Sequence, residues 1–437
     1  MSMADHDFSA ESPVSPDPAP LAAAPWPAPE RAARITRVRT FLCGPQGCPY
    51  LIARVETDQP GLYGLGCASD PQRTLAVRAV LDDYLGPMLH GRYAGDIEDI
   101  HRLLQCSGYW RGGSIANNAL GALDVALWDI AAKLAGLPLY ALFGGRARAY
   151  AEAYTHVDGA DPGEISDRVA AAADAGFRHV RVQVGLPGVD AYGTAPAGAT
   201  DARRRADRAG AWDPLAYLHR VPPVLVEVRR RVGDGVELLH DAHERLTPAQ
   251  ARHLVAALAD ARLFFLEDAL APEDSGYFGQ LRAAAPTPLA VGELFDDVTR
   301  YLPLLEQRAI DFARVRIPTL GGLTPTRKLA AACELFGVRL APHGPGDVSP
   351  VGQAANLALD VSSPAFGVQE AAEFRDATLE VFPGAPVPQR GRLYPASAPG
   401  LGVDFDERAA RRYPAPPPLA HDRWALLRGT DGAAQRP

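Results

Sequence analysis

The 437 residues leave room for a large domain of roughly 250 residues and a second, smaller one. The apolar content of 47% is ordinary for a globular protein, and the formal net charge of −8 gives no reason to expect nucleic acid or an anionic membrane as a partner. The five cysteines form no CxxC pair, and no apolar run approaches the roughly 20 residues of a membrane span. We therefore expect a cytoplasmic protein with reduced thiols.

The first part of the chain changes character at residue 35. Residues 1–34 are rich in Pro and Ala and are predicted to form a disordered tail, since they cannot bury a core. From 35 onwards the pattern alternates in a way that is typical of antiparallel strands joined by Gly and Pro turns. Helical segments follow, among them a long Ala/Leu helix over 115–138 that is apolar on nearly all sides. Residues 35–148 are therefore predicted to form an α+β domain, with this helix buried between domains or subunits.

Strands of a second kind begin near residue 149. Two of them end near His156 and Gln183, and a long loop over roughly 186–220 follows the second strand. Loops of this length in a compact domain are usually functional or disordered. Because it follows the C-terminal end of a strand, this loop is expected to overhang a site.

Three acids recur at a constant spacing in the following stretch. Asp241, Glu267 and Glu293 each end a short apolar run, and 26 residues separate each from the next. This period suits one strand, one covering helix and two short loops. A similar spacing continues to strand ends near Arg316, His343 and Glu370. Continuous apolar runs are typical of parallel strands that are buried on both faces. The pattern predicts an α/β fold, a (β/α)7–8 TIM-type barrel over 149–385, with 386–437 returning to the first domain.

The three acids predict a metal site. In such barrels the polar residues at the C-terminal strand ends build the active site, so the three carboxylates are expected to lie side by side. They would repel one another unless a cation lies among them, and hard oxygen ligands with room for water favour Mg²⁺. The alternative is that each acid caps a helix or forms an ion pair with an arginine.

Several motifs beyond the acids resemble one family. The chain resembles the enolase superfamily and, within it, the mannonate dehydratase subgroup of sugar-acid dehydratases, from about residue 35 onwards. The resemblance implies an enolase-like barrel whose first domain caps the active site. The motifs that carry it are YWRGG (109–113), ALDVALWDIAAKLAGLPLYALFGG (122–145), RVQVGLPG (181–188), HDAHERLTP (240–248), FFLEDAL (264–270), PLAVGELF (288–295), HGPGDVSPV (343–351) and FGVQE (366–370).

The resemblance implies roles for individual residues. Asp241, Glu267 and Glu293 would bind Mg²⁺, and His243 would be the acid that helps the 3-hydroxyl leave. Arg181 and Tyr192 match a pair in which a nearby guanidinium lowers the pKa of the Tyr that removes the proton beside the carboxylate.

Further residues match positions that contact the substrate. The resemblance implies that His343 takes part in proton transfer, beside Asp347. His156 and Arg314 match positions that hold the hydroxyls or the carboxylate of the substrate, and Glu370 matches a position that contacts the substrate. For His156 and Arg314 a structural role is the alternative, as a simple loop hydrogen bond is for His343 and Asp347.

Two departures from related sequences bear on the substrate. The RVQVG strand lacks the Lys-x-Lys of racemase-like branches, which argues against a lysine-based racemase or lactonising enzyme. In the early loop GCASDPQRTLAV, Pro71 stands where the subgroup carries an Asn that reaches the substrate.

The resemblance implies dehydration of an aldonic acid to a 2-keto-3-deoxy acid through a metal-stabilised enediolate, with D-mannonate and D-gluconate as leading substrates. One alternative is an epimerase or racemase, or a dehydratase that acts on another carboxylic acid. Another is a low-activity relative with a regulatory or binding role. The expected partners are a small sugar acid and, because of the apolar helix and the barrel, further copies of the chain in a homo-oligomer.

Overall fold

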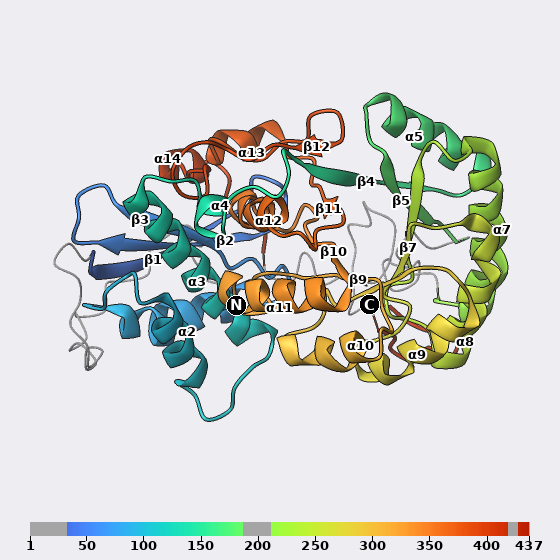
Figure 1. Cartoon of the computed structure of the whole chain (residues 1–437), viewed down its shortest axis with the longest axis horizontal. Coiled ribbons are helices and arrows are strands. Elements are labelled where there is room, and N and C mark those ends of the chain that lie inside the picture. Colours follow the sequence, from blue (N-terminus) through green and yellow to red (C-terminus); the bar gives the residue numbers. More distant parts are fainter. Residues whose placement is uncertain (1–32, 187–210, 418–426, 437) are drawn as a thin grey trace, which may run out of the picture.

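The computed structural model describes residues 33–186, 211–417 and 427–436 (Figure 1). An α+β domain precedes a ring of parallel strands, and Figure 1 shows the two side by side with α11 and α12 between them. The predicted fold class, a TIM-type barrel with an α+β domain before it, is confirmed. Tyr192 and most of the predicted loop over 186–220 lie outside the described residues.

The first domain is built on a three-stranded antiparallel sheet, as its alternating pattern predicted. Helix α3 packs directly on the third strand, because Gly64 and Gly66 have no side chain there: a Cβ at either position would collide with a carbonyl oxygen of α3. The predicted apolar helix is thus buried between this sheet and the barrel helix α11. The elements are β1 (Ile35–Cys43), β2 (Tyr50–Thr57), β3 (Tyr63–Cys67), α1 (Thr74–Ala79), η1 (Val80–Leu85), η2 (Pro87–Leu89), α2 (Ile97–Cys106), α3 (Ser114–Ala135) and α4 (Leu139–Leu142).

Eight parallel strands form the barrel. They pair in sequence order from β4 to β10, β11 pairs with β4, and a parallel bridge between Leu340 and Phe366 closes the ring. Strands β6 and β7 end at the predicted acids, while β8 ends two residues before Glu293. The strands are β4 (Ala151–Gly159), β5 (His179–Val184), β6 (Glu237–Asp241), β7 (Phe265–Glu267), β8 (Leu289–Val291), β9 (Phe312–Ala313), β10 (Arg339–Leu340) and β11 (Gln369–Glu370).

Helices cover the outside of the ring, and side chains at their N-termini define where several of them begin. Asp161 and Asp213 accept hydrogen bonds from first-turn amides, and Thr247 forms a capping box with Gln250. Helix α7 begins at Pro214, so the end of the predicted loop over 186–220 is wrong: the Asp213 cap starts a helix there. The covering elements are α5 (Pro162–Asp174), α7 (Pro214–Val232), α8 (Pro248–Ala257), η3 (Ala259–Ala261), η4 (Pro272–Tyr277), α9 (Phe278–Ala284), η5 (Val298–Tyr301), α10 (Leu302–Glu306), α11 (Leu323–Phe336) and α12 (Pro350–Ser362).

The C-terminal segment contacts both domains. Strand β12 (Arg392–Leu393) pairs with the start of β4, and helices α13 (Asp376–Val381) and α14 (Glu407–Ala410) follow the barrel strands. Glu407 forms ion pairs with Arg39 and Arg54 of the first sheet. Further on, the Trp212 amide donates to the Arg428 carbonyl beside α7.

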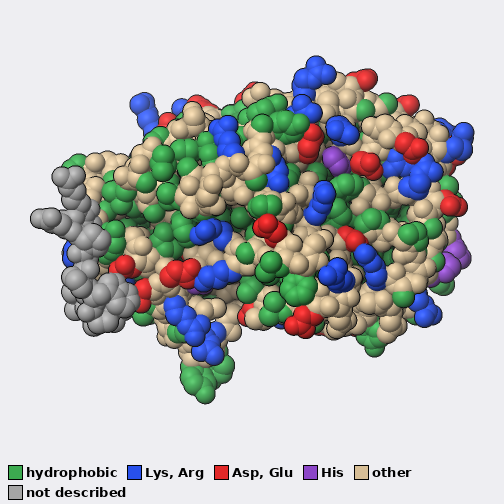
Figure 2. All heavy atoms as spheres, in the orientation of Figure 1, with side chains coloured by type: hydrophobic (Ala, Val, Ile, Leu, Met, Phe, Trp, Pro, Cys, Tyr) green, Lys and Arg blue, Asp and Glu red, His purple; other side chains and the backbone are tan. Residues whose placement is uncertain are grey.

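A loop of the first domain protrudes from the surface. It joins α2 to α3, and Figure 2 shows hydrophobic side chains at the tip of this protrusion. Tyr109 and Trp110 in this loop are 89% and 92% exposed, and the Gly113 amide at its base donates to Asp296 Oδ2. Among the helices in the described ranges, none has the length and apolar character needed to cross a membrane.

Asp129 in α3 connects the first domain to the C-terminal segment through hydrogen bonds. Its buried carboxylate accepts hydrogen bonds from the Leu65 amide of β3 (3.1 Å), the Leu401 amide of the C-terminal segment (2.8 Å) and the Lys133 ammonium (2.7 Å). Burial raises the pKa of Asp129, and the charge of Lys133 opposes that rise. One carboxylate therefore joins three segments that are distant in sequence.

We expect Asp129→Ala to lower the free energy of unfolding by about 3 kcal/mol, because it leaves buried amides and an ammonium without their acceptor. Urea unfolding at pH 7 measures this change. Asp234→Ala is the control, since Asp234 is an exposed partner of Arg262 and its loss should cost less than about 1 kcal/mol. Equal effects of the two substitutions would contradict the proposed role of Asp129.

Candidate active site

The barrel brings most of the predicted site residues to one end. They come from the C-terminal ends of neighbouring strands, where the parallel register places Asp241 beside Glu267 and His156 beside Arg181. The predicted residues that contact one another there are His156, Arg181, Asp241, Glu267, Glu293, Arg314, His343 and Glu370.

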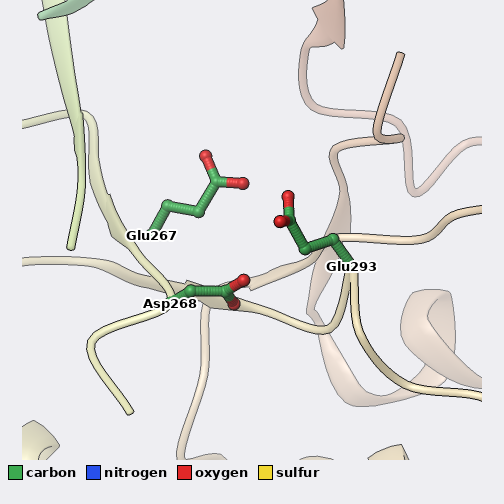
Figure 3. Close-up of side chains that lie close together, drawn as sticks. All are labelled: Glu267, Asp268 and Glu293. Atoms are coloured by element: carbon green, nitrogen blue, oxygen red, sulfur yellow. The ribbon is translucent and has the colours of Figure 1, made fainter. Parts of the chain in front are cut away.

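An acidic cluster occupies this end of the barrel. Each of Glu267, Asp268 and Glu293 offers a carboxylate oxygen, and these three oxygens lie within 4.8 Å of one another (Figure 3). Glu267 and Asp268 are buried and Glu293 is half-buried. Burial, followed by the charges of Asp268 and Glu267, raises the pKa of Glu293 well above its usual range. The cluster thus brings three acids together where burial and mutual repulsion disfavour their ionised forms unless a cation lies among them.

Asp268 was not predicted from the sequence. It directly follows Glu267 at a backbone φ of 39°, and its Oδ1 accepts a hydrogen bond from the Gly292 amide (3.3 Å). The signal for it was the second acid in FFLEDAL. A second acid does not continue a strand that is apolar on both faces, so it is expected only where the chain has already turned at the strand end.

Asp241 lies beside the cluster but is held by other groups. Its Oδ1 accepts a hydrogen bond from the His243 amide (2.7 Å), and its Oδ2 is 3.7 Å from Nη1 of Arg181. Burial alone would raise its pKa, but the charges of His243 and Arg181 lower the pKa of Asp241. Asp241 is therefore a carboxylate with a preference for the ionised form, at the edge of the three-acid cluster.

Two buried arginines lie beneath the acids. Arg314 is fully buried, with Nε 2.5 Å from Glu267 and Nη2 2.7 Å from Glu370, and its Nη1 donates to the Ala341 carbonyl. Nη1 of Arg181 lies 3.3 Å from Glu267 and 3.4 Å from Glu370. Arg314 is thus occupied by protein acceptors and supports the acids from inside the barrel.

Glu370 and His156 form a second pair. His156 Nε2 lies 2.8 Å from Glu370 Oε1. Burial opposes ionisation, yet the charges of Arg314 and Arg181 and the hydrogen bond from His156 hold the pKa of Glu370 well below its usual range. Burial, with the nearby Arg181 charge, lowers the pKa of His156. The pair therefore favours a neutral imidazole beside an ionised carboxylate.

His343 and Asp347 lie in the loop after β10. His343 Nε2 is 3.5 Å from Glu293 Oε2, and burial lowers the pKa of His343 well below its usual range. Within the described part of the chain, His343 Nδ1 and Asp347 Oδ1 are buried without a hydrogen-bond partner. Such unpaired buried polar atoms are costly, which indicates that another group satisfies them in the working site.

His243 lies in the loop after β6 at a positive φ of 55°, half-buried beside the acids. Its Nδ1 is 3.4 Å from Nη2 of Arg245.

Pro71 lies away from the acids. It lines a cavity of about 160 Å³ in the first domain, with Leu42, Pro49 and Pro416 among its other lining residues. That cavity is separate from the acidic cluster, whose residues do not line it. We place the chemistry at the acids because, among the residues that the structure describes, they form the group of carboxylates that could hold a metal ion.

The barrel and its convergent acids define an enolase-like enzyme. Residues 164–409 match the family described as "Enolase C-terminal domain-like", and residues 31–144 match the "Mandelate racemase / muconate lactonizing enzyme, N-terminal domain". Both domains of the chain are thus those of the enolase superfamily.

Individual relatives narrow this class. A protein of Streptomyces sp. (strain SPB074), called "D-galactonate dehydratase family member", is 72% identical over 420 residues, which cover 95% of each chain. A second family member, from Streptomyces sp. (strain SPB78), is 70% identical and covers 99% of this chain and 98% of the relative. The chain belongs to the D-galactonate dehydratase family of the enolase superfamily. The predicted enzyme class, a hydro-lyase of the sugar-acid dehydratase type, is confirmed at this level.

A solved structure is similar over nearly the whole chain. It is an enolase from Pantoea ananatis with bound D-gluconate and Mg, with a TM-score of 0.85 and 42% sequence identity, and the match covers 93% of this chain and all of that one.

The ion pairs of Arg314 generate a prediction about stability. We expect Arg314→Gln to lower the free energy of unfolding by about 3–5 kcal/mol in Mg²⁺-free buffer, because Glu267 and Glu370 lose a buried cationic partner. Urea unfolding monitored by fluorescence measures the change.

Arg282→Ala is the control for this measurement. Arg282 pairs with Asp311 at the surface, and such pairs contribute less than about 1 kcal/mol. An Arg314→Gln protein as stable as Arg282→Ala would show that the acids do not depend on Arg314.

Proposed function

We propose that this enzyme dehydrates an aldonic acid to a 2-keto-3-deoxy acid with Mg²⁺, with D-gluconate and D-mannonate as leading substrates. The observation that carries the proposal is the excess of buried carboxylates over guanidinium groups at the C-terminal end of the barrel. The D-gluconate and Mg bound to the Pantoea ananatis structure support it. D-Mannonate stays a leading substrate because the sequence motifs resemble those of the mannonate dehydratase subgroup.

The acids suit a magnesium ion. Asp241, Glu267 and Glu293 would hold it, since Mg²⁺ prefers carboxylate oxygens, and Asp268 belongs to the same three-acid cluster as Glu267 and Glu293. Burial, together with the charges of neighbouring acids, raises the pKa values of Glu267 and Glu293, and a bound cation would favour their ionised forms. When bound, Mg²⁺ stabilises the negative charge that develops on the substrate carboxylate as the adjacent C–H bond breaks.

The side chains of the protein would hold the acids in place and carry out the two proton transfers. Arg181 and Arg314 hold Glu267 and Glu370 in place, so that the acids keep their geometry without a substrate. Tyr192, activated by Arg181, would take the proton from the carbon beside the carboxylate. His243, which is half-buried and so reachable, would give a proton to the departing 3-hydroxyl, which leaves as water.

The other predicted residues would bind the substrate. His156 with Glu370, and His343 with Asp347, offer polar atoms at the same end of the barrel, and two of these atoms have no partner among the residues that the structure describes. Substrate hydroxyls are suitable partners for them.

Cytoplasmic localisation and assembly into a homo-oligomer stay predictions. Helix α3 no longer supports a homo-oligomer, because it is buried inside one chain.

A second candidate retains the deprotonation without the elimination. Pro71 stands where the subgroup carries a substrate-binding Asn, and it lines a cavity away from the acids. This favours a changed selectivity, and it leaves open an epimerase or an enzyme for another carboxylic acid. Product analysis separates the candidates, since only dehydration yields a keto acid.

The proposed reaction is tested by a screen of aldonic and aldaric acids with Mg²⁺, in which semicarbazide detects 2-keto-3-deoxy products. We expect turnover of D-gluconate or D-mannonate. His243→Asn should lower kcat by about 10²–10⁴-fold, the usual contribution of a general acid.

Glu98→Gln is the matched control for this screen, since Glu98 pairs with Lys328 on the surface and should leave kcat unchanged. A folded, Mg²⁺-loaded protein that converts none of these acids would refute the proposed reaction and favour the regulatory or binding role.

Magnesium binding is tested without turnover. Mg²⁺ at about 100 times its dissociation constant should stabilise the folded protein by about 2.7 kcal/mol, and EDTA should reverse this. Glu267→Gln should abolish the stabilisation, because it removes the most buried ligand charge. Thermal unfolding with and without Mg²⁺ measures both effects, and a Glu267→Gln protein that Mg²⁺ still stabilises fully would contradict the assignment.

A further inference from the structure

Hydrogen bonds within the loop that follows β3 fix its shape. Asp70 Oδ1 accepts hydrogen bonds from the amides of Gln72 (3.1 Å) and Arg73 (2.8 Å), and the Thr74 hydroxyl donates to the Asp70 carbonyl. The Ser69 hydroxyl accepts a hydrogen bond from the Leu51 amide of β2. Residues 69–74, which we call the capping loop, therefore have a defined shape of their own.

Arg316 connects the capping loop to the barrel. It lies three residues after β9 and is 9% exposed. Its Nη2 donates to the Ser69 carbonyl at 2.6 Å, and its Nη1 donates to Asn118 Oδ1 of α3 (3.0 Å) and to Thr319 Oγ1 (2.7 Å). One guanidinium thus joins the capping loop, the long buried helix and the loop after β9.

The same arginine lies near the site. Burial raises the pKa of Asp347, the Arg316 charge opposes that rise, and the Asp70 charge adds to it, so all three groups are within electrostatic reach. Tyr50 of β2 donates a hydrogen bond to the Gly346 carbonyl (2.7 Å), which fixes the first domain against the loop that carries Asp347. The capping loop therefore approaches the barrel at the substrate-binding end.

Arginine has a specific advantage at this position. Its planar, rigid fork donates in several fixed directions, whereas lysine is a compact charge on a flexible stem. The three acceptors of Arg316 belong to three separate segments, and a lysine ammonium at the same place would not reach all of them with good geometry.

We propose that Arg316 is a positioning residue that sets substrate selectivity by fixing the capping loop relative to the Asp347 loop. This proposal rests on the proposed function, since selectivity is defined for the sugar acid that the barrel binds. Arg316 takes no part in proton transfer. The position of the capping loop decides which hydroxyl configuration of an aldonic acid fits against Asp347 and its neighbours.

The first test measures the loop itself. Hydrogen exchange of the full chain, compared between wild type, Arg316→Lys and Arg316→Met, should show exchange about tenfold or more faster in the peptide over 68–76, with regions that Arg316 does not contact unchanged. A lost hydrogen bond to a charged group corresponds to roughly 10–100-fold in an equilibrium. Thr319→Val, which removes one anchor of Arg316, should act in the same direction with a smaller effect.

The second test measures selectivity with the Mg²⁺-loaded protein. Arg316→Lys should raise KM about tenfold, change the ratio of kcat/KM between D-gluconate and D-mannonate about fivefold or more, and leave kcat within about threefold, because lost positioning removes binding contacts. Arg229→Lys is the matched control: Arg229 is also buried and donates to main-chain carbonyls, but at the opposite end of the barrel. It should lower stability and leave the ratio unchanged.

The outcomes separate this proposal from the proposed function. If wild type converts neither acid, the proposed reaction fails, and calorimetric binding of the two acids still reports selectivity. Unchanged exchange over 68–76, an unchanged preference between the acids, or a loss of kcat without a change in KM would each overturn the positioning role of Arg316. The same shift in preference in Arg229→Lys would also overturn it.

Discussion

Repulsion among buried carboxylates is the constraint on which the rest of this structure depends. Glu267, Asp268 and Glu293 place oxygens within 4.8 Å of one another in a region with little water to screen them. Arg314 and Arg181 offset part of this repulsion by holding Glu267 and Glu370 from inside the barrel. The arginines thus hold two of the acids, and the remaining negative charge is what a divalent cation would neutralise.

The barrel and the first domain contribute in different ways. The barrel supplies charged groups at strand ends, where backbone pairing fixes their positions. The first domain supplies loops, and buried polar side chains join its segments to other parts of the chain: Asp129 joins β3 to the C-terminal segment, and Arg316 joins the capping loop to the loop after β9. On the proposed function, the barrel would carry the chemistry and the capping loop would set the selectivity.

Prediction from the sequence succeeded where the signal is local and periodic. The 26-residue spacing of Asp241, Glu267 and Glu293 follows from the length of one strand and one helix, so β6 and β7 end at the first two acids and β8 ends two residues before the third. Asp268 was missed because its position beside the other acids depends on the turn of the backbone after β7. Tyr192 lies outside the described residues, so its role stays a prediction.

The sequence by itself determined the class of fold, the order of the strands and the acids at their ends, because hydrophobic period and chain length act over short distances. Only the tertiary structure decided which charges meet. Arg181 reaches Glu370 because closure of the barrel brings β11 beside β4, which pairs with β5, and Arg316 reaches Ser69 across 247 residues because two domains pack together. Such contacts depend on the summed packing of many elements, and no local pattern of residues encodes them.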